Sequence, residues 1–322
     1  MFCAKLLTVE DYDVFEELYD DFYKKAATEY NFELEPVDYK GFIDSVEKNL
    51  IQCIILYDNH VAVGFLVYTT AISEAIELNI IHCIQKDNYL TYAKELLVKF
   101  LELTSNIRKK KVVCYPMLGD QKSLIGVIAK LGFQFIGTEV LRFKTEGTQS
   151  KELFARARLV ELPQGYSVVK WSSMYFEDAV EIIQESFNDS ADALFDPRFK
   201  SIAGCRDIIT KVVKDVYAQF LPEATSVLLY EGRPAGFAFM NLTGGTIVNI
   251  PLVGIKQEHQ GKGLSTIMLK NSMDVILKDE KYKNISEINT TTETNNLQAL
   301  RLYKNLGFLE DYNYPQAYLS QG

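Results

Sequence analysis

The sequence has few residues of the kinds that build metal centres and disulfide frameworks. Among 322 residues it contains three histidines, five cysteines and one tryptophan. The histidines are scattered, and the cysteines are odd in number and form no Cys-x-x-Cys pair, so neither a disulfide scaffold nor a zinc site is predicted. We therefore expect no metal cofactor and a cytoplasmic protein with reduced, buried thiols. Export as a secreted effector stays open as an alternative.

Positive charge and long apolar runs are also scarce. The 34 Lys and Arg residues against 43 Asp and Glu residues give a net charge of −9 at pH 7. Apart from the short run Arg108–Lys111, the basic residues are spread out, which argues against a nucleic-acid or anionic-membrane surface. No uncharged apolar stretch reaches the roughly eighteen residues of a membrane span, and the N-terminus has no signal-peptide core. The acidic balance favours a basic or amine-bearing partner.

The chain contains an internal repeat. A strand–turn–strand pattern around Gly64 returns around Gly236, at an offset of 172 (236 − 64), and a Leu-Gly-Phe motif at Gly132 returns at Gly307, at an offset of 175 (307 − 132). Matching features in the same order at nearly constant offset predict two copies of one fold. The boundary is expected near Pro163, which gives domains at residues 1–160 and 164–322.

Each copy follows the same predicted order of elements. An opening strand precedes helices, a β-hairpin and an apolar strand, and then come a helix, a strand, a helix and a final β segment. Antiparallel strands early and a βαβα stretch late predict an α/β fold, in which helices flank a mixed, mostly antiparallel sheet.

A glycine-containing turn in the second copy carries the first functional signal. The apolar strand Val253–Ile255 leads into Gln260-Gly261-Lys262-Gly263, and a helix then begins near Leu264. Uncovered N–H groups at a helix N-terminus attract anionic phosphates, and glycine lets a ligand approach the backbone closely. An ATP-type P-loop is excluded because Gly263 stands where Ser or Thr is required. The alternative is a strand-to-helix turn that binds nothing.

A second motif follows near the C-terminus. Asn295 or Asn296 is suited to cap a helix, and Gly307 is suited to end it in the left-handed conformation. Tyr303 falls on the apolar face of this predicted helix. By itself it reads as an ordinary core tyrosine.

Together the two motifs resemble those of the GNAT acyltransferases. The family pattern Gln/Arg-x-x-Gly-x-Gly/Ala is compared with Gln257–Gly263, and Asn-x-x-Ala-x-x-Leu-Tyr-x-x-x-Gly-Phe matches Asn296–Phe308. The resemblance is specific over residues 225–310, rests on hydrophobic pattern alone for much of residues 1–145, and covers nearly the whole chain. It implies a tandem GNAT protein whose second copy binds acetyl-CoA.

The resemblance also implies residue roles. Backbone N–H groups from Gln260 to Ser265 would hold the pyrophosphate with help from Lys262, and the strand at Val253 would pair with the pantetheine arm and polarise the thioester carbonyl. Tyr303 would protonate the leaving thiolate. The cofactor-binding set is then Val253, Ile255, Gln260, Gly261, Lys262, Gly263, Leu264, Ser265 and Asn296.

The general base is less clearly marked. Some relatives carry a Glu on the strand before the Asn, and the aligned residue here is Thr291. Glu293 lies close by and can act directly or through water; the alternative is a solvated or helix-capping carboxylate. The tail Tyr312–Tyr318 either lines the acceptor site or packs as an edge strand.

The first copy lacks both motifs. An offset of 171 places Tyr89–Tyr92 opposite the glycine turn, and an offset of 175 places Gln121 opposite Asn296 and Ile128 opposite Tyr303. We expect this copy to be degenerate and non-catalytic.

The sequence therefore predicts an N-acyltransferase that moves an acetyl group from acetyl-CoA to a primary amine. The acceptor is a protein or peptide N-terminus, a lysine or a small metabolite, so a protein substrate is possible. Direct attack in a ternary complex is favoured because no cysteine lies near the motifs. The alternative is a non-enzymatic acyl-CoA-sensing or protein-binding tandem module.

Overall fold

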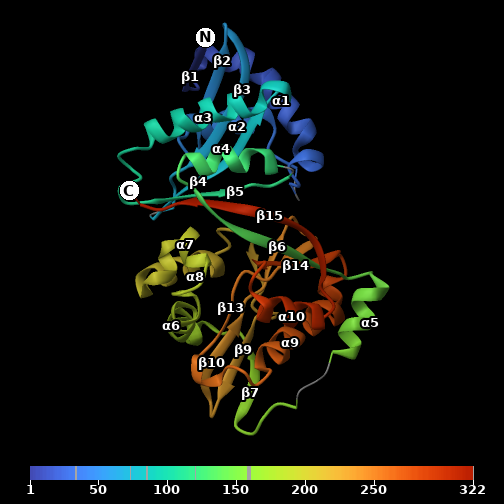
Figure 1. Ribbon diagram of the computed structural model, residues 1–322. Helices are drawn as coiled ribbons and strands as arrows, with labels where there is room; N and C mark the ends of the chain where they lie inside the picture. Colours follow the sequence, from blue (N-terminus) through green and yellow to red (C-terminus); the bar gives the residue numbers. More distant parts are fainter. Residues whose placement is uncertain (33–34, 73, 85, 120, 158–160, 322) are drawn as a thin grey trace. The chain divides into compact units, whose positions relative to one another are not determined.

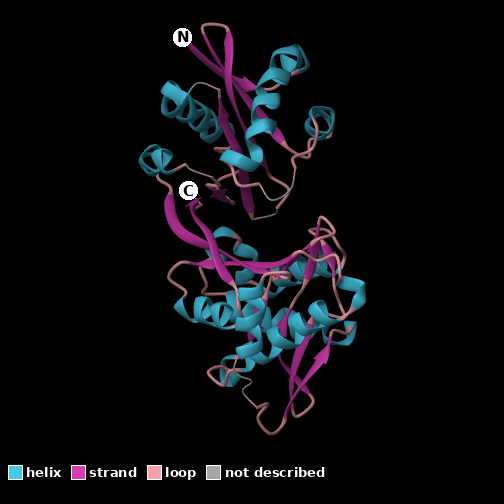
Figure 2. Cartoon of the chain, turned by 90° about the vertical axis from the view of Figure 1, so that its right-hand side faces the viewer, coloured by secondary structure: helices cyan, strands magenta, loops and turns pink. Residues whose placement is uncertain are grey.

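The computed structural model describes all residues except 33–34, 73, 85, 120, 158–160 and 322. The chain forms two compact units: unit 1 comprises Met1–Ile136, Leu194–Asp196 and Tyr314–Gly322, and unit 2 comprises Gly137–Ala193 and Pro197–Asn313. Strands and helices alternate in both units (Figures 1 and 2), which confirms the predicted α/β class.

Unit 1 contains one sheet with the strand order β1-β2-β3-β4-β5-β15. Neighbouring strands are antiparallel except for β4 and β5. Its elements are β1 (Phe2–Leu6), α1 (Tyr12–Glu29), α2 (Tyr39–Glu47), β2 (Gln52–Asp58), β3 (Val61–Thr69), β4 (Ala75–Cys83), α3 (Tyr89–Leu103), β5 (Val112–Pro116), α4 (Ile125–Lys130) and the end of β15 (Leu309–Leu319).

Helices cover both faces of this sheet because its inner strands are apolar on both sides. Phe15 of α1 and Phe42 of α2 pack with Phe65 in one buried cluster. Phe100 of α3 and the neighbouring residue Leu66 belong to a second cluster. Successive residues of β3 thus point to opposite faces, as the pleat of a strand requires.

Unit 2 has two sheet segments, ordered β13-β10-β9-β7 and β6-β14-β12-β11-β8. Its strands are β6 (Gln134–Lys144), β7 (Tyr166–Lys170), β8 (Gln219–Phe220), β9 (Ser226–Tyr230), β10 (Arg233–Ala238), β11 (Asn241–Thr243), β12 (Ile247–Asn249), β13 (Val253–Ile255) and β14 (Glu287–Glu293). Its helices are α5 (Thr148–Arg156), α6 (Phe176–Phe187), α7 (Asp192–Phe195), α8 (Ile202–Val213), α9 (Leu264–Lys278) and α10 (Leu297–Asn305).

Short 3₁₀ helices join several of these elements. They are η1 (Val9–Asp11), η2 (Lys86–Asn88), η3 (Lys122–Leu124), η4 (Ser173–Tyr175), η5 (Pro197–Lys200), η6 (Gln257–His259) and η7 (Glu280–Tyr282).

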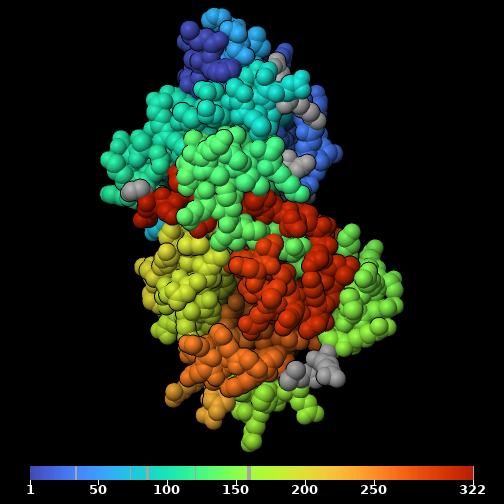
Figure 3. Space-filling view, viewed as in Figure 1, coloured from blue at the N-terminus to red at the C-terminus, as the bar shows by residue number. Residues whose placement is uncertain are grey.

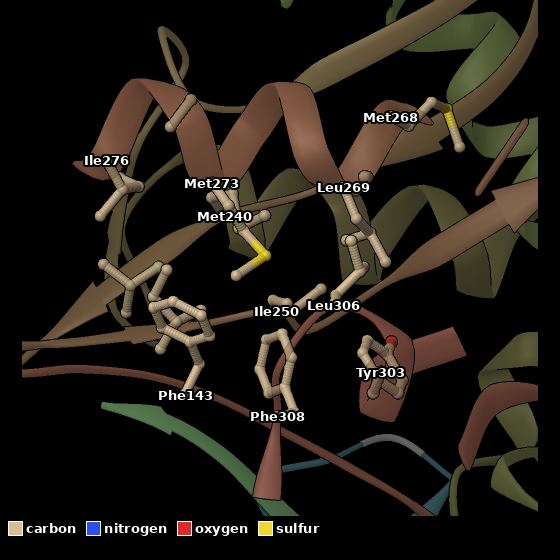
Figure 4. Packing of buried hydrophobic residues seen from close by; sticks show 14 of the residues in the cluster. Phe143, Met240, Ile250, Met268, Leu269, Met273, Ile276, Tyr303, Leu306 and Phe308 are labelled. Atoms are coloured by element: carbon tan, nitrogen blue, oxygen red, sulfur yellow. The ribbon is translucent and has the colours of Figure 1, made fainter. Parts of the chain in front are cut away.

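Two buried clusters hold unit 2 together. The apolar faces of α6 and α8 pack with Phe237 and Phe239 in one cluster, and α9 and α10 pack with Phe143 and Phe308 in the other (Figure 4). In Figure 3 the green atoms of α5 lie against the orange-red atoms of α10 and the strand that follows. This approach needs glycine at position 307, because a Cβ there would lie 2.4 Å from the Ser150 carbonyl oxygen and φ is +90°.

The two units repeat one order of elements, and each receives a strand from the other half of the sequence. In unit 1, Gln316–Leu319 of β15 pairs antiparallel with β5. In unit 2, Thr138–Lys144 of β6 pairs antiparallel with β14. The compact units therefore exchange segments, whereas the boundary between 160 and 164 stays a prediction about the repeated copies.

Two further features concern the cysteines and the apolar character of the helices. All five cysteines carry free thiols, and four of them are buried. Among the helices of the described residues, none has the length and apolar character that crossing a membrane requires.

Candidate functional site

The parallel strands of unit 2 diverge at Pro251. Strand β12 runs parallel to β14, and the backbone N–H of Ile250 still donates to the Asn289 carbonyl at 3.0 Å. Pro251 follows and has no N–H to continue the ladder. Strand β13 then pairs with β10 and forms the edge of the other sheet segment. As a result, β13 and β14 lie in different sheet segments and separate after residue 250.

The open edge of β13 carries the backbone groups of Val253 and Ile255. Residues 252 and 256 form 2.9 Å backbone hydrogen bonds with the strand on the β10 side. Because alternate residues of an antiparallel strand face its partner, Val253 and Ile255 direct their N–H and carbonyl groups toward the separation. Gln260 Nε2 donates to the Ile255 carbonyl at 2.9 Å. This glutamine thus holds the turn against the strand end.

The glycine turn has the conformation that the sequence predicts. Gly261 and Gly263 have φ angles of +75° and +74°, and Gly263 is the N-cap of α9. A Cβ at Gly261 would meet no heavy atom within 4 Å. The backbone angle, and not crowding, therefore demands glycine there. The first hydrogen bond of α9 is donated by Thr266 N to the Gly263 carbonyl at 3.1 Å, so the preceding N–H groups lie at the positive end of the helix.

The side chain of Lys262 contacts Tyr166, a residue that sequence reasoning missed. Its Nζ donates to Tyr166 Oη at 3.0 Å and to the Glu258 carbonyl at 3.2 Å. Tyr166 Oη lies 2.7 Å from His259 Nδ1. No local pattern signals this contact, because Tyr166 precedes His259 by 93 residues. Counting back from Gly261 also places Glu258, not Gln257, at the first position of the family pattern.

Tyr303 brings a hydroxyl to the point where the strands separate. Its ring is 6% exposed and packs edge-on against Phe308, with centroids 5.4 Å apart (Figure 4). The hydroxyl shares a hydrogen bond with Thr290 of β14, and Thr290 Oγ1 donates to the Ile250 carbonyl at 3.3 Å. Burial is the main cause that raises the pKa of Tyr303 above its usual value. The phenol is therefore protonated at neutral pH.

Asn296 and Glu293 are engaged with each other. Asn296 Oδ1 accepts from Ala299 N at 3.1 Å, so this asparagine is the N-cap of α10. Its Nδ2 donates to Glu293 Oε2 at 3.3 Å, and Thr292 Oγ1 lies 3.4 Å from the same oxygen. In this arrangement Glu293 is the cap-associated carboxylate that the sequence offered as the alternative to a base. Its catalytic role stays a prediction.

The structure corrects the alignment of the first copy's turn. Helices α3 and α9 each have 15 residues and start at Tyr89 and Leu264, an offset of 175 (264 − 89). The segment opposite Gly261–Gly263 is therefore η2 (Lys86–Asn88), and the predicted register with Tyr89–Tyr92 was wrong by four residues (175 − 171). Glycine is missing in either register, and Asn88 caps α3 with φ of −104°.

Aromatic side chains occupy the corresponding interior of unit 1. An offset of 175 places Tyr115 of β5 opposite Thr290 and Ile128 opposite Tyr303. Tyr115 is 1% exposed and donates to Gln121 Oε1 at 2.5 Å. Burial raises its pKa, and the nearby Tyr89 adds to the effect. In unit 1 the buried hydroxyl is that of Tyr115 on strand β5, whereas in unit 2 it is that of Tyr303 on helix α10.

The described residues contain no group of side chains suited to bind a metal ion. In the part of the chain that the structure describes, no three His, Cys, Asp or Glu side chains converge in a way that could hold a metal ion.

The fold and the site can now be compared with known protein families. The chain has two copies of a mixed α/β fold, and the second copy carries a glycine turn and a buried tyrosine. Residues 184–308 match the model of the acetyltransferase (GNAT) family. A GNAT-family domain is thus recognised at residues 184–308, and the chain as a whole shares its fold with a solved tandem GNAT protein.

Solved structures share this fold over the whole chain. A GCN5-related N-acetyltransferase from Sphaerobacter thermophilus superposes with a TM-score of 0.65 at 13% identity, covering 99% of this chain and 95% of that one. A tandem GNAT protein from the clavulanic acid biosynthesis pathway gives 0.64 at 13% identity, covering 100% and 99%. A fungal glucosamine N-acetyltransferase region gives 0.62 at 11% identity, covering 99% of this chain and 38% of that one. No curated protein matches the sequence.

Proposed function

We propose that the protein is an N-acyltransferase that transfers an acetyl group from acetyl-CoA to a primary amine, with the second copy as the catalytic one. One observation carries the proposal. The glycine turn follows β13 and is tied to its end through Gln260, β13 has an open edge, and the Tyr303 hydroxyl hydrogen-bonds Thr290 of β14. An anion site, an extended backbone edge and a proton donor are the groups that an acyl-CoA reaction needs.

We infer where the cofactor would bind by matching its chemistry to these groups. The N–H groups around Gly261–Ser265 would hold the diphosphate at the positive end of α9. The pantetheine amides would hydrogen-bond along the edge at Val253 and Ile255, as an added strand does. One of these N–H groups would then donate to the thioester oxygen and stabilise the charge that develops there in the transition state.

Tyr303 would act as the general acid. The amine nitrogen attacks the thioester carbon, and the tetrahedral intermediate collapses as the C–S bond breaks and its electron pair leaves with sulfur. A thiol has a reference pKa of about 8.5, so a proton from Tyr303 eases its departure. The attacking amine loses a proton to solvent, and solvent returns a proton to the Tyr303 phenolate.

The demand on a base depends on the acceptor. A free α-amino group at pH 7 needs about one pKa unit of help, or ~1.4 kcal/mol, whereas a lysine side chain needs more than three units, or nearly 5 kcal/mol. Glu293 would supply this help only after it leaves Asn296. A covalent route is disfavoured because Cys205, the cysteine of unit 2, is fully buried with its thiol directed at the Arg198 carbonyl.

The test combines cofactor binding with a matched pair of variants. Wild-type protein should bind acetyl-CoA in a calorimetric titration and release free thiol with at least one member of an amine panel. Tyr303→Phe should lower kcat by about 10²–10⁴-fold, the usual contribution of a general acid. Tyr282→Phe is the control, since Tyr282 belongs to the same buried cluster and its hydroxyl has no hydrogen-bond partner among the described residues. Equal kcat values for the two variants across pH 6–9 would remove Tyr303 from the mechanism.

A second candidate is a non-enzymatic acyl-CoA sensor. The engagement of Glu293 with Asn296 favours it, because no other base has been assigned. Tight acetyl-CoA binding without thiol release across α-amino, lysine and small-amine acceptors would select this candidate.

A further inference from the structure

The ammonium group of Lys262 is folded back onto the glycine turn. Lys262 stands between the two left-handed glycines, and its Nζ reaches Tyr166 Oη at 3.0 Å and the carbonyl of Glu258 at 3.2 Å. The same Nζ lies 5.6 Å from the centre of the Tyr166 ring. Lys262 therefore links back to Glu258, at the start of the segment 258–262, and also to Tyr166 of β7.

The Tyr166 hydroxyl takes part in two hydrogen bonds. Lysine can only donate, so Tyr166 Oη accepts from Lys262. Tyr166 Oη also lies 2.7 Å from His259 Nδ1, and the donor in this second hydrogen bond depends on the histidine tautomer. The other nitrogen, Nε2, faces Glu258 Oε1 at 3.2 Å. The chain therefore runs from Lys262 through Tyr166 and His259 to Glu258.

The centre of this chain packs against β9. Tyr166 is paired with Tyr230 in the β7–β9 ladder, and their rings lie 4.7 Å apart. His259 is 9% exposed and packs against both rings, with centroid distances of 5.6 Å to Tyr166 and 5.0 Å to Tyr230. A sheet residue thus gives the turn a fixed reference point.

We propose that Tyr166 and His259 are positioning residues, and that Lys262 braces the diphosphate-binding turn instead of binding the diphosphate. The inference rests on the proposed acetyl-CoA function for its ligand. A turn with two glycines is flexible when free. The brace holds residues 258–262 in the curvature that presents the N–H groups of the turn. Cofactor affinity then depends on a preorganised backbone, which lowers the ordering cost of binding.

A double-mutant cycle on cofactor binding separates a brace from a direct contact. Tyr166→Phe and Lys262→Met should each raise the Kd for coenzyme A about tenfold, which corresponds to the loss of one hydrogen bond to a charged group. The double variant should also bind about tenfold more weakly, since each change removes the same Lys262–Tyr166 hydrogen bond. In turnover, Tyr166→Phe should raise KM for acetyl-CoA with little change in kcat.

A control variant and a cofactor-free readout complete the test. Tyr230→Phe removes a hydroxyl from the same aromatic group, with no hydrogen bond to it among the described residues, and should leave Kd unchanged. Without any cofactor, Tyr166→Phe and Lys262→Met should each speed amide hydrogen exchange about tenfold at His259 and Gln260, whose N–H groups donate to the Lys256 and Gln257 carbonyls.

The outcomes are distinguishable. A hundredfold loss in the double variant would show that Lys262 contacts the diphosphate independently of Tyr166 and would overturn the brace. Unchanged exchange rates in both single variants would overturn it as well. If the wild type fails to bind acetyl-CoA while the variants still accelerate exchange, the proposed function is wrong and the brace remains.

Discussion

The substitution Gly261→Ala tests the placement of the cofactor most directly. Gly261 has φ of +75°, and a Cβ built there meets nothing within 4 Å. The loss of stability is therefore conformational only, about 1–2 kcal/mol for an L-residue in the left-handed region. A matched control exists in the β9–β10 turn, where Gly232 has φ of +79° and the same open surroundings. Gly232→Ala should lose a similar amount of stability.

The two variants should differ in cofactor binding alone. If the diphosphate lies against the N–H groups of the turn, the added methyl group meets it in the bound state. We expect Gly261→Ala to weaken acetyl-CoA binding by at least tenfold, or ~1.4 kcal/mol, and Gly232→Ala to bind like the wild type. Thermal unfolding of the apo proteins measures the shared loss, and calorimetric titration measures the difference. Wild-type affinity in Gly261→Ala would refute the placement of the diphosphate.

Two further predictions concern unit 1. Because Tyr115 is buried in the region that corresponds to the site of unit 2, titration should show one acetyl-CoA per chain, and a stoichiometry of two would contradict the degenerate assignment. The second concerns His82, which hydrogen-bonds Tyr30 and Asp21 and whose pKa burial lowers to about 4. Above pH 6.5 the histidine is neutral in both states, but between about pH 6.5 and 4 it gains a proton only on unfolding. Unit 1 should therefore lose stability over this range, and His82→Gln should lose less in a melting-temperature series; parallel curves would contradict this.

Some of the site was predictable because its determinants are local. The left-handed glycines, the Asn296 cap and the buried face of α10 each depend on residues within one or two helical turns. The repeat was also visible, because equivalent elements keep nearly constant spacing. Constant spacing was less reliable in the loop before α3, where the copies differ in length and the predicted register was wrong by four residues.

The sequence by itself thus determined the two copies, the fold class and the position of the glycine turn, since periodicity and turn chemistry are short-range properties. Only the tertiary structure decided which strands complete each sheet, because β6 and β15 pair with strands remote in sequence and no local pattern selects those edges. The same holds for the brace. Tyr166 and Lys262 are 96 residues apart, and only the folding of β7 beside the turn brings the hydroxyl to the ammonium.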